Sequence, residues 1–138
     1  MKTKEKKDSN KSLSDKTEIP IDDISKLIDT MILDPKILQN GYQILLNYEY
    51  RKNFYFNILK LCFDAEKEKK NLKMKLCGSI FHTFIKQNYE SEDKIPNEEK
   101  LNIVSYILTL IDTKNYYLKN LIANVIRFYR GKRISKLL

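Results

Sequence analysis

Cys77 and His82 are the side chains best suited to nucleophilic and acid–base chemistry in this chain, and His82 is its only histidine. A thiolate–imidazole pair needs both groups within hydrogen-bond reach of each other. Five residues on one helix place the two side chains well apart around the helix axis. The spacing therefore predicts no catalytic pair, and His82 is expected to be an imidazole on a helix surface.

The two cysteines, Cys62 and Cys77, each lie inside an apolar helical pattern. This placement favours buried free thiols in a reducing compartment, with a disulfide as the alternative. One histidine and no close pair of ligands predict no metal site.

Four acidic residues stand at the starts of expected helices, where the helix dipole favours negative charge. They are Asp22, Asp23, Glu98 and Glu99. The dipole accounts for them without general acid–base chemistry or a metal. The chain also lacks a glycine-rich phosphate loop. We therefore expect no enzymatic activity and no cofactor.

The C-terminal stretch "RFYRGKRISKLL" concentrates positive charge without a single acid. Its basic residues are Arg127, Arg130, Lys132, Arg133 and Lys136. Such a cluster predicts contact with RNA phosphates or an acidic protein surface. The alternative is a solvated helix end whose cations complement the dipole. The whole chain has a net charge of +8, from 26 basic and 18 acidic residues, which favours polyanionic or acidic partners.

Length and composition indicate one helical domain. The chain has 138 residues, 42% of them hydrophobic, with only 3 Gly and 3 Pro, which are too few for the turns of an all-β fold. Residues 1–18 are charged and are expected to be a disordered tail, and residues 19–138 to form the domain. No apolar run is long enough for a transmembrane helix, and the N-terminus does not read as a signal peptide.

Apolar periodicity predicts six helices, at 21–33, 35–48, 53–66, 71–89, 97–111 and 115–130. Asp34 and Pro35 separate the first two as an N-cap and a first helical residue. Asn97 is a candidate N-cap and Gly131 a candidate C-terminal stop. Gly78 interrupts the fourth helix, which suggests the close approach of another helix.

The buried sides of the last two helices follow the same periodicity. The fifth helix is expected to bury Leu101, Val104, Ile107, Leu108 and Ile111, and the sixth Leu118, Leu121, Ile122, Val125 and Tyr129. Residues 118–138 carry more apolar side chains than one inward stripe requires. We therefore expect this segment to form a partner-facing end, by self-association or by docking on a larger chain.

Six helices in three antiparallel hairpins, with a unit of about 40 residues, are typical of a short HEAT-like α-solenoid. A generic helical bundle explains the periodicity equally well, and both architectures stay open at this level.

Five stretches in order along residues 21–138 carry a family resemblance. They are "GYQIL" from Gly41, "FYFNILKL" from Phe54, "CGSIFHTFIKQNY" from Cys77, "IPNEEKLNIVSYILTLI" from Ile95 and "LKNLIANVI" from Leu118. Their order and spacing resemble the N-terminal domain of the importin-β (karyopherin-β) superfamily. The resemblance implies stacked HEAT hairpins and a protein-interaction role in nuclear transport, in cytoplasm and nucleus, with the Ran GTPase or nucleoporins as partners.

The chain departs from the family pattern at several positions. Tyr42 stands where the family has an acidic residue, and His82 and Thr83 stand in place of a Lys-Asn pair. These departures bear on whether Ran binding is retained. The resemblance implies Ran-facing residues on the second, fourth and sixth helices, namely Gln39, Gln43, His82, Thr83, Lys86, Asn124 and Arg127. The alternative function is a small basic helical protein that associates with RNA or ribosomes through its C-terminal cluster.

Overall fold

The computed structural model describes residues 17–88 and 95–137, with side chains up to Arg127. The described residues form α-helices and one short 3-10 helix, and no strand occurs among them. The elements are α2 (Ile21–Leu33), η1 (Pro35–Ile37), α3 (Leu38–Tyr48), α4 (Phe54–Lys67), α5 (Asn71–Asn88), α6 (Asn97–Thr109) and α7 (Tyr116–Leu137). The predicted all-α class is confirmed.

Local sequence explains most of the boundaries. The side chain of Asp34 accepts a hydrogen bond from the Lys36 amide at 3.0 Å, and Pro35 opens the turn η1 as predicted. Asn53 adopts a left-handed conformation (φ 61°), which asparagine tolerates better than most residues, immediately before α4.

Two predicted helix boundaries were wrong. The N-cap position of α6 is occupied by Pro96, and Asn97 is already the first helical residue. Helix α7 continues through Gly131 to Leu137. A glycine inside a helix costs only about 1 kcal/mol relative to alanine, and the residues after Gly131 include no proline that would break the helix.

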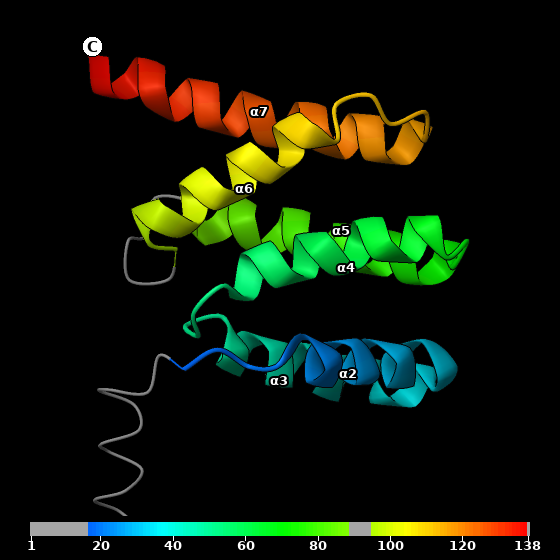
Figure 1. Cartoon of the computed structure of the whole chain (residues 1–138). Coiled ribbons are helices and arrows are strands. Elements are labelled where there is room, and N and C mark those ends of the chain that lie inside the picture. Colours follow the sequence, from blue (N-terminus) through cyan, green and yellow to red (C-terminus); the bar gives the residue numbers. More distant parts are fainter. Residues whose placement is uncertain (1–16, 89–94, 138) are drawn as a thin grey trace, which may run out of the picture.

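The helices lie in three layers, which Figure 1 shows as α2 with α3, α4 with α5, and α6 with α7. The middle pair packs most closely. Helix α4 buries nine of its residues, as its apolar sequence predicted. Helix α2 contacts both helices of the middle layer, α6 contacts α4, and α7 contacts α5. The core therefore runs through the middle layer.

A buried carboxylate on α6 ties the third layer to the second. Both oxygens of Glu99 receive backbone N–H groups at the start of α4: Oε1 from Asn53 at 3.1 Å, and Oε2 from Tyr55 at 2.9 Å and Phe56 at 3.3 Å. The first amides of a helix have no partner within the helix, so Glu99 caps α4 from another helix. The dipole of α6 alone therefore does not fully explain why an acidic residue stands at position 99.

Two opposing effects act on the pKa of the Glu99 carboxyl group. Burial raises the pKa of Glu99, and the three backbone N–H donors partly offset that rise. A raised folded-state pKa means that the proton-linked part of the Glu99 contribution to stability is complete below its unfolded pKa and is lost as the pH rises through the folded pKa. The three backbone hydrogen bonds to the side chain are a separate contribution.

A second polar cluster joins the first layer to the middle one. The hydroxyl of Tyr55 on α4 donates to Glu49 Oε2 at 3.0 Å, just after α3. The amide of Asn88 on α5 donates to the same carboxylate oxygen at 3.0 Å and to the Tyr55 hydroxyl at 3.2 Å. Glu49 and Tyr55 are both buried. Burial raises the pKa of the Tyr55 phenol, and the neighbouring Glu49 carboxylate raises it further.

Helix α2 is held to α5 by a buried ammonium group. Lys73 Nζ lies 3.0 Å from Asp29 Oδ1 and also contacts the Ser25 hydroxyl. Lys73 is buried, whereas Asp29 is about half exposed. Asp29 supplies the opposite charge for the Lys73 ammonium group, which would otherwise be costly to bury.

The expected burial of the two free cysteines is confirmed, and a neighbouring helix reaches Gly78 through one side chain. A Cβ added at Gly78 would lie 2.6 Å from the Tyr117 hydroxyl oxygen, so the Tyr117 side chain of α7 fills the space over this glycine. Tyr117 also donates to the Lys75 carbonyl at 3.1 Å. Cys62 and Cys77 are free and buried, and burial raises the pKa of Cys77 to about 12.

The predicted tail ends earlier than expected. Residues 1–16 lie outside the described residues. Glu18, placed in the tail by its sequence, accepts hydrogen bonds from the side-chain amides of Asn53 at 3.0 Å and Asn57 at 2.9 Å. These two bonds, that from Asn57 first, lower the pKa of Glu18.

Candidate partner-binding groove

Helix α6 carries two apolar stripes, and only one of them is buried. The buried stripe consists of Ile103 and Ile107, with the carboxylate of Glu99 at its start, and it faces α4. Tyr106 extends this contact, because its ring meets Phe56 and Phe63 of α4 edge-on, with centroids 5.4 and 5.9 Å apart.

The second stripe was predicted to be buried, and that prediction was largely wrong. Leu101, Leu108 and Ile111 are 58%, 56% and 53% exposed, and Val104 is half-buried. Only Ile107 of the five predicted residues is buried. The reason is geometric: the Glu99 carboxylate must reach the α4 N-terminus, and this contact turns the neighbouring stripe away from α4. We call Leu101, Val104 and Leu108 of α6, together with Ile111 in the turn just after the helix, the α6 stripe.

On helix α7 the predicted buried residues are confirmed as far as the side chains are described. Leu118, Leu121, Ile122 and Val125 are buried, and α7 packs on α5. The expected partner-facing end at 118–138 rests mostly on additional apolar residues beyond Arg127, and it stays a prediction. Side chains beyond Arg127 lie outside the described residues. Among the described side chains of this layer, the exposed leucine and isoleucine residues lie on α6 and in the turn after it.

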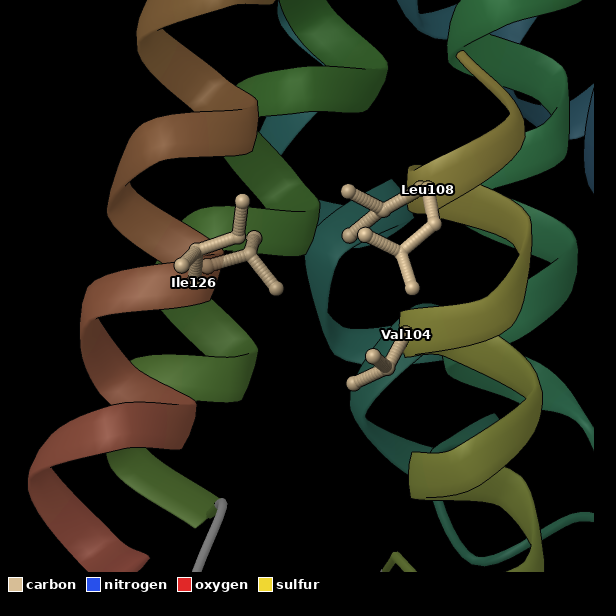
Figure 2. Close-up of a pocket in the computed structure, with 5 residues that line it drawn as sticks. Val104, Leu108 and Ile126 are labelled. Atoms are coloured by element: carbon tan, nitrogen blue, oxygen red, sulfur yellow. The ribbon is translucent and has the colours of Figure 1, made fainter. Parts of the chain in front are cut away.

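A pocket lies where the α6 stripe meets α7. It is lined by Val104, Ile107 and Leu108 of α6 and by Val125 and Ile126 of α7, and it has a volume of about 170 Å³. Figure 2 shows Val104 and Leu108 directed across the space toward Ile126. We call the pocket together with the α6 stripe the α6–α7 groove.

The lining of the groove determines what it can do. All five pocket residues are aliphatic and offer no polar side-chain atom, so the pocket has no group for acid–base, nucleophilic or metal chemistry. An aliphatic cavity of about 150 Å³ can hold a small apolar molecule such as benzene. The groove is thus suited to receiving apolar side chains.

Helix α7, which forms one side of the pocket, is basic in sequence. Its sequence has six basic residues and no acid: Lys119, Arg127, Arg130, Lys132, Arg133 and Lys136. Lys119 and Arg127 are exposed. The backbone of the other four is helical, and their side chains lie outside the described residues, so the predicted C-terminal basic cluster is placed only in part.

The other predicted partner-facing residues are spread over three helices. Gln39 and Gln43 are exposed on α3, Thr83 and Lys86 are exposed on α5, and His82 is half-buried there. Asn124 is half-buried on α7. It accepts a hydrogen bond of 3.5 Å from Arg127 Nη1, so the structure brings these two predicted residues together.

The described residues contain no group of three or more His, Cys, Asp or Glu side chains arranged to hold a metal ion. Across 17–88 and 95–137, none of the helices combines the length and apolar character that spanning a membrane requires.

Sequence reasoning missed the groove, although a signal for it was present. The α6 stripe and the Glu99–Ile103–Ile107 stripe are both at helical spacing, so more of α6 is apolar than one contact can bury.

Comparison with protein-family models, with curated proteins and with solved structures found no match to this chain. The resemblance to the importin-β superfamily therefore stays a prediction.

Proposed function

We propose that this chain is a non-enzymatic protein-interaction module that binds its partner in the α6–α7 groove. The observation that carries the proposal is the α6 stripe, whose exposed aliphatic side chains lead into an aliphatic pocket. Contiguous apolar surface of this kind is unfavourable in water and is typical of protein–protein contact sites. A ligand site for a small polar molecule would need converging polar groups, which the pocket lining lacks.

The finer architecture we propose is a short HEAT-like α-solenoid resembling the importin-β N-terminal domain. The three layers and the contacts of α4 with α6 and of α5 with α7 support it. In a solenoid each repeat covers the apolar side of its neighbour, so the α6–α7 layer would present its outer side to the next repeat or to a partner. A transport role requires capture of GTP-loaded Ran in preference to GDP-loaded Ran, and equal or absent capture of both would exclude it.

The proposal is tested by exchanging one exposed leucine. Leu108→Ser should weaken partner binding about tenfold or more, because loss of an aliphatic side chain from a groove costs roughly 1–3 kcal/mol. Leu33→Ser is the matched control, since Leu33 is 84% exposed on α2, in the opposite layer. A photo-crosslinking residue at position 108 identifies the partner, whose affinity is then measured with purified proteins by calorimetry.

Two results would overturn this proposal. One is a partner that crosslinks equally from positions 108 and 33. The other is a purified partner that binds Leu108→Ser as tightly as the unmodified chain.

RNA or ribosome association is the second candidate, favoured by the run of basic residues without acids on α7. It makes the opposite predictions: affinity that falls steeply with salt through counterion release, and no response to Leu108→Ser.

A further inference from the structure

We infer that the occupant of the α6–α7 groove is an acidic amphipathic helix of a partner protein. This inference rests on the proposed function and names the class of partner. It draws on three observations: the aliphatic lining of the pocket, the spacing of the α6 stripe and the charge of α7.

The lining selects a helix over an extended peptide. An extended segment carries backbone N–H and C=O groups that need partners, and unpaired groups are costly to bury. The pocket side chains supply none, because all are aliphatic. The described residues also contain no strand whose edge could pair with a peptide. A helix satisfies its own backbone and presents only side chains, which suits this surface.

The spacing of the α6 stripe matches helix packing. Leu101, Val104, Leu108 and Ile111 follow one another at intervals of three, four and three residues. The helical part of the stripe, Leu101 to Leu108, extends about 10 Å and Ile111 continues it into the following turn, so the stripe can meet about two turns of a second helix whose apolar residues have the same spacing. The partner helix is expected to place one of these residues in the pocket between Leu108 and Ile126.

The charge of α7 selects an acidic helix. Six basic residues and no acid occur along α7, and Lys119 and Arg127 are exposed in its described part. Acidic side chains flanking the partner's apolar stripe would complement the positive charge of α7. A second copy of this chain would instead bring another net charge of +8 and another basic α7 to the interface. The lysine-rich N-terminal segment is disfavoured as an occupant for the same reason.

Three labelled peptides of about 16 residues test the inference, each capped at both ends and rich in helix formers. The first has leucines at three–four–three spacing with glutamates at the flanking positions. The second replaces those glutamates with lysines. The third keeps the first composition but moves the leucines off the stripe. Binding to the full chain is followed by fluorescence anisotropy at low and physiological salt.

The first peptide should bind at least about tenfold more tightly than either of the others. Leu108→Ser should reduce its affinity by a similar factor, and Leu33→Ser should leave it unchanged. Helix formation on binding should make the ellipticity of the mixture at 222 nm more negative than the sum of the separate peptide and protein signals.

Each contrary result has a distinct meaning. Equal binding of the acidic and basic peptides would overturn the acidic partner and leave the proposed function standing. Equal binding of the first and third peptides would show simple polyanion binding, which an RNA would share, and would overturn the helix. Indifference of all binding to Leu108→Ser would overturn both proposals. A dimer by light scattering that Leu108→Ser converts to a monomer would make a second copy the occupant.

Discussion

Replacing Glu99 with alanine is expected to lower the free energy of unfolding by about 3 kcal/mol. The substitution leaves the amides of Asn53, Tyr55 and Phe56 without their carboxylate acceptor. An unpaired buried donor costs about 1–3 kcal/mol, and loss of a helix cap alone costs up to about 2 kcal/mol. The cost of burying the carboxylate offsets part of this loss, which keeps the expected total below the sum of three donors.

Urea unfolding followed by circular dichroism measures this effect. Glu98→Ala is the matched control, because Glu98 is the exposed neighbour in the same first turn, and it should change stability by no more than about 0.5 kcal/mol. Glu99→Gln should fall between the two, since its amide can replace only one accepting oxygen. Equal losses for Glu98→Ala and Glu99→Ala would mean that the cap on α4 contributes nothing.

Replacing Tyr55 with phenylalanine should cost about 2 kcal/mol while leaving the ring packing in place. The hydroxyl is a donor to the buried Glu49 carboxylate and an acceptor for Asn88. Hydrogen bonds to charged groups are worth about 1.5–3 kcal/mol, more than neutral pairs. Tyr116→Phe is the control, because that ring is 79% exposed at the start of α7, and it should be close to neutral.

The pH dependence of this second effect has a defined sign. The folded-state pKa of Tyr55 is raised above its unfolded value. Its contribution is therefore fully present below a pH of about 10, the ordinary pKa of tyrosine, and is lost as the pH rises toward the folded-state pKa. The stability difference between Tyr55 and Tyr55→Phe chains should be constant from neutral pH to about pH 9 and shrink above pH 10. A difference that grows in alkali would contradict the buried phenol.

Local sequence predicted where most helices begin and end. The bounds of α2 agree with the apolar period, and Asp34 with Pro35 set the start of η1 through a side-chain cap and a fixed φ. The apolar run from Phe54 predicted the burial of α4, and Gly78 predicted contact with another helix. These features depend on neighbouring residues in one helix, so periodicity and capping rules are sufficient for them.

The choice of buried face on α6 is a different kind of property. The Glu99–Ile103–Ile107 stripe and the α6 stripe both satisfy helical periodicity, and nothing within α6 ranks one above the other. The three unpaired amides at the start of α4 make the choice, because only a rotation that brings Glu99 to them also satisfies its carboxylate. Acceptor and donors are more than 40 residues apart in the chain.

The sequence alone therefore determined the all-helical class, most helix boundaries and the basic character of α7. Tertiary structure decided that Leu101, Leu108 and Ile111 are exposed, although the same periodicity had placed them on a buried side. Helical periodicity specifies which residues share a face, because that follows from a repeat of about 3.6 residues. It does not specify which face meets which neighbour, because that depends on contacts between distant helices, and the candidate groove is a consequence of those contacts.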